Sequence, residues 1–444
     1  MVVNLQKNIM QSKYIYNSIL AVAILAMASC KPEFKTLTPS KGTADFSRYI
    51  AVGNSLTAGY ADGGLYLEGQ QNSYPEMIAA QMKTVGGGSF TSPFFSAAQS
   101  NGSGYLSLTG FTASGTPITT AVTTNLAIRG QINIPPYGNI TLYTKYTGDL
   151  NNYGVPGIKL LQITSAGYGN LNGYFERLLP ASSPAVNTSY LDFVTANPFT
   201  FFSCWLGNND ILAYATAGGA SPADQPTDKG TFTALYNLAI STLTAKGAKG
   251  VVATIPNVLS TPYFTTVTLA SLLKAVQVSA PTVTALYIQT GTGTVRAATS
   301  LDYFVLPLAS ANLIGVPNGG GYPYGLHPLN PIKSQYVLDR DEAEIVADYT
   351  DSYNAAIKSI AAAKGLAVMD AFSLLNEYSA GKVVNGVAVN GAYITGNLFS
   401  LDGIHLTPMG YAIVANAYIK AINAQYGSTI PIVDITKYRG VKFP

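Results

Sequence analysis

The sequence predicts an α/β fold in which a doubly wound, largely parallel sheet is covered by helices on both faces. Two observations predict it. Near-continuous apolar runs end in turn-forming residues, and helical patterns alternate with these runs along the chain. Strands that are covered on both faces read as continuous apolar runs, and alternation of strand with helix is typical of parallel sheets. The chain has 444 residues, 48% of them hydrophobic, which is enough for a large core.

The predicted strands are apolar segments that end at or near Gly, Pro, Asp or Asn. They cover residues 47–53, 198–207, 250–256 and 365–371. Cys204 and Trp205 lie within the second of these segments. A single free Cys in an apolar run has no intramolecular disulfide partner, so we expect its side chain in the core.

The predicted helices show apolar residues at spacings of three and four. They cover residues 74–82, 232–248, 341–365 and 407–427. The third opens with acidic residues, which the helix dipole favours there, and closes at Lys364-Gly365. The fourth begins with Thr407 as its cap and Pro408 at the first helical position.

Three stretches interrupt this alternation. Residues 84–150 are rich in Gly, Ser and Thr, and residues 258–340 mix apolar runs with a Gly- and Pro-rich segment. Residues 382–396 carry an Asn-Gly pair between β-branched residues, which indicates a hairpin. We expect all three to be insertions in one domain that spans 47–427, followed by a C-terminal tail at 428–444.

The N-terminal segment reads as a targeting signal. Lys7 and Lys13 precede the apolar run "SILAVAILAMAS", which ends in small residues directly before Cys30. The stretch "MASC" resembles the lipobox of bacterial lipoproteins, which implies a signal peptide over 1–29, lipidation of Cys30 and a tether over 30–46. The protein would then be exported and lipid-anchored at the outer membrane, the cell surface or the periplasmic face. A plain signal peptide with an incidental Cys is the alternative.

Charge and composition exclude several classes of function. Without the two lysines of the leader, 23 basic residues stand against 22 acidic ones, and no cluster of Lys and Arg is present. Such a balance does not attract nucleic acid, and we expect the membrane to be a partner only through the lipid anchor. The chain has two histidines, His327 and His405, and neither has a Cys or His at a spacing that suits zinc. We therefore expect no metal and no cofactor.

Ser55 directly follows the first predicted strand, in "AVGNSLTAG". In an open α/β sheet, ligands bind beyond the carboxyl ends of the strands, where Ser55 lies. Taken alone, such a Ser is usually a helix cap. The two interpretations, cap and nucleophile, stay open at this point.

Two further stretches place Gly and Asn where backbone or side-chain amides could reach a ligand. In "NNYGVPGIKL", Gly154 and Gly157 allow a close approach of the backbone. In "WLGNNDIL", a pair of Asn residues at 208–209 follows a buried strand, where an Asn amide could stabilise a developing oxyanion. We expect Asp210 to brace the turn that holds Asn209. Each stretch alone is also consistent with an ordinary loop or turn.

The stretch "SLDGIHLTPMGY" places Asp402 three residues before His405, just ahead of the last helix. A loop of that length can turn the carboxylate toward the imidazole, which fixes its tautomer and stabilises the imidazolium. The other histidine, His327, lies between Gly and Pro in an insertion. We expect it to be structural or at the rim of a site, with substrate contact as the alternative.

The order and spacing of these four stretches resemble the SGNH, or GDSL-type, hydrolase family. The resemblance implies a flavodoxin-like three-layer sandwich. It also implies Ser55 as nucleophile, His405 as general base and Asp402 as the residue that orients His405. The oxyanion hole would consist of the backbone N–H groups of Ser55 and Gly157 and the side chain of Asn209.

One residue departs from the family pattern, because Asn54 stands where Gly-Asp-Ser-Leu has Asp. That Asp is not a member of the triad, so we expect the change to alter hydrogen bonds around the turn and to leave the reaction possible. The resemblance implies a serine esterase that acts on an acyl or acetyl ester of a glycan or a lipid. Two alternatives remain: an acyltransferase with the same triad, and a non-catalytic glycan-binding surface lipoprotein.

Overall fold

The computed structural model describes residues 38–112 and 115–444. The predicted signal peptide, Cys30 and the first part of the predicted tether lie outside the described residues. The compact unit spans Pro39–Pro444. Within the described part of the chain, no helix is both long enough and apolar enough to cross a membrane.

The centre of the fold is a five-stranded sheet in which every pairing is parallel. Its strands in spatial order are β6 (Asn152–Gly154), β1 (Tyr49–Gly53), β7 (Phe201–Trp205), β8 (Lys249–Ala253) and β13 (Ala367–Met369). Numbered along the chain, this order is 2-1-3-4-5, the flavodoxin-like order of a doubly wound sheet. The predicted fold class is thereby confirmed.

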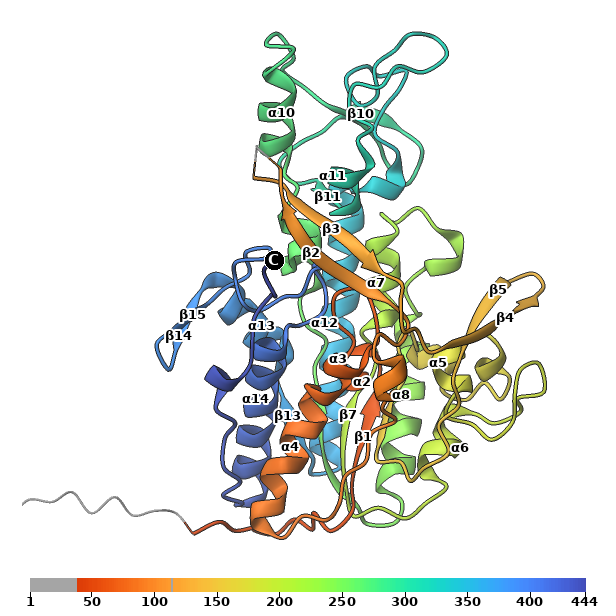
Figure 1. The fold of residues 1–444 in the computed structure, drawn as a ribbon, viewed down its shortest axis with the longest axis vertical. Helices are drawn as coiled ribbons and strands as arrows, with labels where there is room; N and C mark the ends of the chain where they lie inside the picture. The colour runs from red at the N-terminus through yellow and green to blue at the C-terminus, as the bar shows by residue number, and fades with distance from the viewer. Residues whose placement is uncertain (1–37, 113–114) are drawn as a thin grey trace, which may run out of the picture. The chain divides into compact units, whose positions relative to one another are not determined.

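Helices cover both faces of the sheet, which gives three layers (Figure 1). One face is packed by α4 (Tyr74–Met82), α13 (Ala371–Ala380) and α14 (Pro408–Tyr426). The other is packed by α6 (Tyr190–Thr195), α7 (Asn209–Thr216), α8 (Lys229–Thr244) and α12 (Arg340–Ala363). Successive side chains of a strand point to opposite faces, so Ile50 and Val52 join the second group while Tyr49 and Ala51 join the first.

The predicted strands and long helices are present, with ends shifted by a few residues. α4 has the predicted bounds, and α14 begins at Pro408 with Thr407 as its cap, as predicted. The sequence analysis missed β6, because its three residues contain Asn and Gly and form no apolar run. They become a strand only by pairing with Ala51, Val52 and Gly53 of β1. Cys204 and Trp205 are fully buried, and burial raises the pKa of the Cys204 thiol to about 12.

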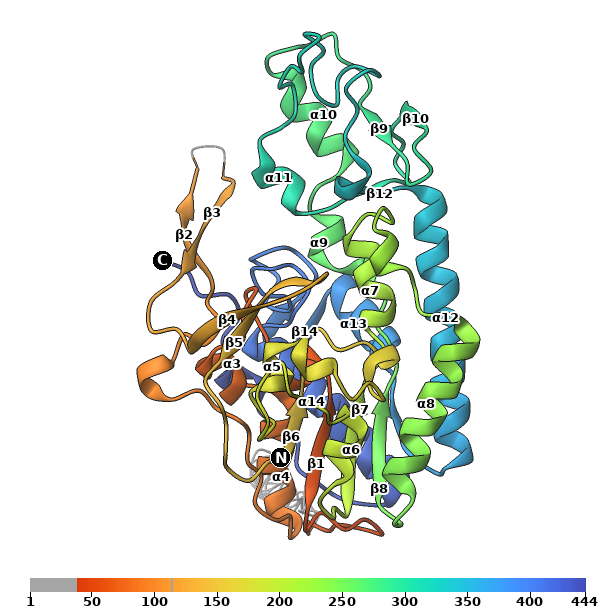
Figure 2. The same cartoon turned by 90° about the vertical axis from the view of Figure 1, so that its right-hand side faces the viewer.

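The first insertion, 84–150, forms two antiparallel hairpins, of which the first projects from the layers in Figure 2 and the second in Figure 1. One consists of β2 (Tyr105–Phe111) and β3 (Pro117–Val122), and the other of β4 (Ile128–Ile134) and β5 (Gly138–Tyr143). The second of these hairpins packs against the short helix α5 (Gly173–Glu176). It therefore lies close to the region between β6 and β7.

The second insertion, 258–340, has a small core of its own that includes Ile288, Phe304 and Ile332. Its elements are α9 (Pro262–Thr265), α10 (Leu269–Gln277), β9 (Tyr287–Gln289), β10 (Val295–Ala297), β11 (Tyr303–Phe304), α11 (Pro307–Ala311) and β12 (Val337–Leu338). A third, short hairpin joins β14 (Lys382–Val384) to β15 (Val387–Val389). Asn385 and Gly386 between them both have positive φ, as a type I′ turn requires.

Segments on both sides of residues 47–427 pack against the core. Ala44 and Phe46, in the stretch expected to be a tether, are buried beside α14. Val433 and Ile435, in the stretch expected to be a tail, join the same cluster. The packed unit therefore extends beyond 47–427 at both ends.

Candidate active site

The candidate site lies at the carboxyl ends of the three neighbouring strands β6, β1 and β7. Ser55 is the first residue of α2 (Ser55–Ala58), two positions after β1 ends, and Asn209 is the first residue of α7. Gly157 follows β6 by three residues, and His405 lies three residues before α14. Because parallel strands end at the same edge of a sheet, four segments from distant parts of the sequence meet here.

The turn from β1 into α2 depends on local side chains. Asn54 caps α2, since its Oδ1 accepts a hydrogen bond from the backbone N–H of Leu56 at 3.1 Å. A Cβ on Gly53 would lie 2.8 Å from the carbonyl oxygen of Trp205, so only Gly fits between the two strands there. Within the described residues, the buried Nδ2 of Asn54 has no hydrogen-bond partner. Asn54 thus supports the turn, and no hydrogen bond of the described residues joins its side chain to His405 or Asp402.

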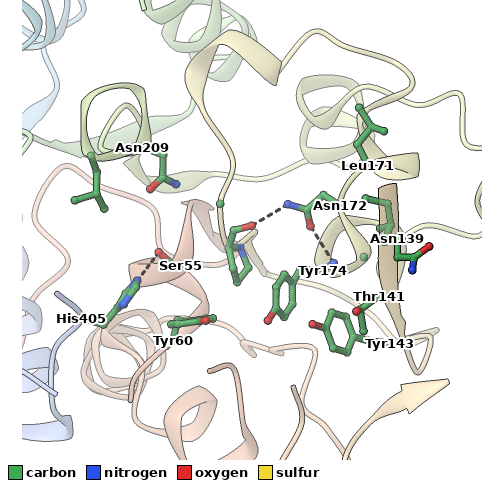
Figure 3. Close-up of a pocket in the computed structure, with 15 residues that line it drawn as sticks. Ser55, Tyr60, Asn139, Thr141, Tyr143, Leu171, Asn172, Tyr174, Asn209 and His405 are labelled. Atoms are coloured by element: carbon green, nitrogen blue, oxygen red, sulfur yellow. Dashed lines mark hydrogen bonds between the residues drawn. The ribbon is translucent and has the colours of Figure 1, made fainter. Parts of the chain in front are cut away.

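Ser55, His405 and Asp402 form a continuous chain of hydrogen bonds. His405 Nε2 lies 2.8 Å from Ser55 Oγ, and His405 Nδ1 lies 2.7 Å from Asp402 Oδ2. Figure 3 shows Ser55 and His405 facing each other at one end of a pocket. The structure therefore brings these three predicted residues together, although Ser55 and His405 are 350 positions apart in the sequence.

The carboxylate of Asp402 is held in its ionised form. Burial by itself would raise its pKa, but the imidazole of His405 and the backbone N–H groups of Ile404 and His405 outweigh burial and lower the pKa. The two N–H groups donate to Asp402 Oδ1 at 2.9 and 2.8 Å. Asp402 is thus a fixed negative charge beside the ring of His405.

The loop after α2 also holds Asp402 in place. Gly63 donates its backbone N–H to Asp402 Oδ2 at 2.9 Å, and Ser400 donates its hydroxyl to Asp402 Oδ1 at 3.2 Å. Ser400 in turn accepts a hydrogen bond from the backbone N–H of Asp62. The sequence analysis missed Asp62, Gly63 and Ser400, and none of them carries a local pattern that would have indicated the contact.

Tyr60 packs against the imidazole from the pocket side. Its ring centroid lies 4.6 Å from that of His405, and its hydroxyl donates to the carbonyl of Gly63 at 2.6 Å. The ring therefore limits the orientations that His405 can adopt. Burial raises the pKa of Tyr60 far above its usual value, so the phenol stays protonated.

The pocket at Ser55 also contains the side-chain amide of Asn209 and backbone N–H groups that are unpaired within the described residues. In the described part of the chain, the backbone N–H groups of Ser55 and Gly157 donate no hydrogen bond. Asn209 donates one N–H of its amide to the carbonyl of Ile158 at 2.9 Å, which holds the amide beside the segment that follows Gly157. Ser55, Gly157 and Asn209 all line the same pocket as His405.

Asn172 sets the orientation of the Gly157 N–H. Its Nδ2 donates to the carbonyl oxygen of Pro156 at 2.9 Å, and its Oδ1 caps α5 by accepting from the N–H groups of Tyr174 and Phe175. The carbonyl of Pro156 and the N–H of Gly157 belong to one trans peptide plane and point in opposite directions. With the carbonyl turned to Asn172, the N–H of Gly157 points away from Asn172. The sequence analysis missed Asn172, although an Asn before Gly-Tyr-Phe-Glu fits a helix cap.

Asp210 links the segment after Gly157 to α7. Its carboxylate accepts hydrogen bonds from the backbone N–H groups of Leu160 and Leu161 and from the hydroxyl of Thr227. Burial raises its pKa to about 6, against these hydrogen bonds. Together with the bond from Asn209 to Ile158, these contacts tie the start of α7 to the loop that carries Gly157.

The pocket has a volume of about 420 Å³, and one of its walls comes from an insertion. Beyond Ser55, Gly157, Asn209 and His405, it is lined by Tyr60, Asn139, Ile140, Thr141, Tyr143, Pro156, Leu171, Asn172, Gly173, Tyr174 and Leu212. His327 is not part of this lining and instead stacks on Tyr322 in the second insertion. Among the described residues, no group of three or more His, Cys, Asp or Glu side chains is arranged to hold a metal ion.

Comparison with known proteins gives a family model and solved structures that match most of the chain. A model of the family GDSL-like Lipase/Acylhydrolase matches residues 49–418. Among solved structures, the chain is similar to LAE5, an alpha/beta hydrolase enzyme from the metagenome of Lake Arreo, Spain. The identity is 11%, the match covers 86% of this chain and 97% of that chain, and the TM-score is 0.36. A second solved structure is 12% identical, with 85% and 98% covered and a TM-score of 0.32. No curated protein matches the chain.

Proposed function

We propose that this hydrolase, which belongs to the GDSL-like lipase/acylhydrolase family, is a serine esterase. In this proposal Ser55 is the nucleophile, His405 the general base and Asp402 the residue that orients His405. The observation that carries the proposal is the chain of hydrogen bonds at 2.8 and 2.7 Å that joins these three side chains at the end of an open pocket.

Acylation begins with a proton transfer. His405 Nε2 takes the proton from Ser55 Oγ as the oxygen attacks the ester carbonyl carbon, and the carbonyl electron pair moves onto its oxygen. When the tetrahedral intermediate collapses, the bond to the alcohol oxygen breaks. His405 then gives its proton to the leaving alcohol. Asp402 stabilises the imidazolium between these two steps.

The oxyanion of the intermediate needs preorganised hydrogen-bond donors. We assign this role to the backbone N–H groups of Ser55 and Gly157 and to the side-chain amide of Asn209. One such donor typically contributes about 3–4 kcal/mol to the stability of the transition state. Deacylation repeats the sequence with water, which His405 deprotonates as it attacks the acyl group on Ser55. In each step, the nucleophilic Ser, the base and the oxyanion donors are residues of this chain.

We also propose that the esterase is exported and lipid-anchored through Cys30. The support is in the sequence alone: a basic start, a short apolar run and small residues directly before the Cys. An anchor of this kind would hold the enzyme close to substrates at the membrane or the cell surface.

The test of the proposed function compares Ser55→Ala with a matched serine variant on a series of p-nitrophenyl esters from acetyl to long-chain. Among the described residues, Ser55 Oγ forms a hydrogen bond only with His405, so the variant should fold, and hydrolysis should fall to the background rate. Ser279→Ala, at an exposed position of the second insertion, should keep full activity. Undiminished hydrolysis by Ser55→Ala would refute the assignment. Faster acyl transfer to an added alcohol than to water would instead identify an acyltransferase.

A further inference from the structure

We propose that the pocket wall formed by Tyr60, Tyr174 and β5 binds the alcohol part of the ester, and that this alcohol is a neutral sugar. The inference rests on the proposed function, because it takes His405 as the group that protonates the leaving alcohol. It adds a binding site for that alcohol and names its chemical class.

The position of His405 defines which side of the pocket receives the alcohol. The general base must lie within hydrogen-bond distance of the alcohol oxygen in order to protonate it. The carbonyl oxygen, in contrast, faces the N–H of Gly157 and the amide of Asn209. Leu212 follows Asn209 by one helical turn on α7, and both line the pocket. We therefore place the acyl group of the ester on the side of Asn209 and Leu212. The alcohol therefore extends along the wall that begins at His405.

A row of aromatic rings follows that wall. Tyr60 lies against His405, with ring centroids 4.6 Å apart, and Tyr174 meets Tyr60 edge to face at 6.4 Å. Tyr143 of β5 stacks on Tyr174 at 4.5 Å. Figure 3 shows Tyr174 and Tyr143 at the side of the pocket away from Asn209. A pyranose ring has C–H groups on its faces, which pack well against the face of a Tyr.

Polar groups border this aromatic row and none carries a charge. Thr141 and Asn139 of β5 also line the pocket, two and four residues before Tyr143. The Oδ1 of Asn139 accepts a hydrogen bond from Asn133 Nδ2 at 3.0 Å, which orients its own amide donor. No Asp, Glu, Lys or Arg is among the residues that line the pocket. Uncharged amides and hydroxyls suit the hydroxyl groups of a neutral sugar, whereas a long alkyl chain would need an unbroken apolar lining.

The hairpin is fixed where it reaches the site. A Cβ on Gly173 would lie 1.9 Å from the carbonyl oxygen of Thr141, so the start of α5 and β5 can approach this closely only with Gly at that position. Buried Glu176 at the end of α5 forms ion pairs with Arg129 of β4 at 2.6 Å and with Lys145 at 2.8 Å. These contacts hold the wall in place before any ligand binds, which lowers the entropic cost of binding.

The test uses three acetates that share the acyl group and differ in the alcohol: a monoacetylated methyl glucoside, glycerol triacetate and ethyl acetate. Release of acetate gives kcat and KM for each. We expect kcat/KM to be highest for the glucoside. Tyr174→Leu, which keeps bulk but removes the flat ring, should raise KM for the glucoside about tenfold, a much larger change than its effect on KM for ethyl acetate.

Two further variants keep the result interpretable. Asn139→Ala changes an exposed side chain and should raise KM for the glucoside more than KM for ethyl acetate, even if Tyr174→Leu loses stability. Tyr137→Leu alters a Tyr that is 65% exposed at the turn of the same hairpin, outside the pocket, and should match the wild type on all three acetates. The inference is overturned if the glucoside is no better than glycerol triacetate, or if the pocket variants affect all three acetates equally. Hydrolysis of ethyl acetate that depends on Ser55 would leave the proposed function intact in either case.

Discussion

The substitution Asn172→Asp separates the two roles that the structure gives to Asn172. Asp keeps the side-chain oxygen that caps α5, and a negative charge is favourable at a helix N-terminus. It removes the amide donor that holds the carbonyl of Pro156 at 2.9 Å and puts a second acceptor in its place. The peptide between Pro156 and Gly157 is then free to turn the N–H of Gly157 away from the oxyanion.

The expected size of the effect follows from two bounds. Complete loss of one oxyanion donor lowers kcat by about 10²–10³. Loss of only the bias supplied by one neutral hydrogen bond, worth about 1–1.5 kcal/mol, lowers it about 5–10-fold. Because the new carboxylate also repels the carbonyl of Pro156, we expect kcat on p-nitrophenyl acetate to fall about 10–100-fold. KM should stay nearly constant, since the donor acts mainly in the transition state.

Two measurements and one control decide the result for Asn172→Asp. Thermal unfolding should show a Tm close to that of the wild type, whereas Asn172→Ala should lose about 1 kcal/mol with the cap. Asn139→Asp adds the same charge to the same pocket without a contact to Pro156, and its kcat on p-nitrophenyl acetate should stay within about threefold of the wild type. A wild-type kcat for Asn172→Asp, or an equal fall for the two Asp variants, would refute the role of Asn172 in orienting Gly157.

Three further predictions concern other parts of the chain. Asp402→Asn should lower kcat by about 10⁴, because His405 loses the carboxylate that stabilises its charged form, and a fall of less than tenfold would contradict this. Its Tm should also fall, since one amide group cannot accept the hydrogen bonds that both carboxylate oxygens of Asp402 accept. Burial and the neighbouring Asp339 carboxylate raise the pKa of Glu342 from 4.5 to about 7. The stabilisation that protonated Glu342 contributes to the folded state is therefore fully present below about pH 4.5 and is lost as the pH rises through 7. Urea unfolding at pH 5 and pH 8 should therefore show a smaller loss of stability for Glu342→Gln than for the wild type, and equal losses would count against it. Cys30→Ala should move the expressed protein from the detergent phase to the aqueous phase in a detergent partition, and unchanged partitioning would reject the lipid anchor.

The sheet and its helices could be predicted because their signals are local. The strand at 49–53 and the helix at 408–426 each carry their own apolar pattern and end signals. β6 has no such signal, since Asn152, Tyr153 and Gly154 extend only because β1 offers them hydrogen-bond partners. The first insertion is predicted only as an interruption of the alternation, and the packing of its second hairpin against α5 depends on tertiary contacts.

The residues of the candidate site could also be predicted only in part. Ser55, Gly157, Asn209, Asp402 and His405 were identified from short motifs in a fixed order, and the structure brings them to one pocket. Among the residues that hold them, Asp210 is predicted to brace the turn of Asn209, whereas Asn172 and Gly63 are not identified. Asn172 contacts Pro156 across 16 positions and Gly63 contacts Asp402 across 339, so their roles exist only after folding. The Asn at position 54, unusual for the family, proves to be a helix cap.

The most direct test of the central claim is covalent labelling with a p-nitrophenyl phosphonate ester, followed by mass spectrometry of the digested protein. The account predicts one phosphonyl group per chain on the peptide that contains Ser55, with release of p-nitrophenol and loss of esterase activity in equal proportion. Asp402→Asn should be labelled far more slowly, since Ser55 is then activated less effectively by His405. Labelling of any other residue, or full esterase activity in protein that is fully labelled at Ser55, would contradict the account.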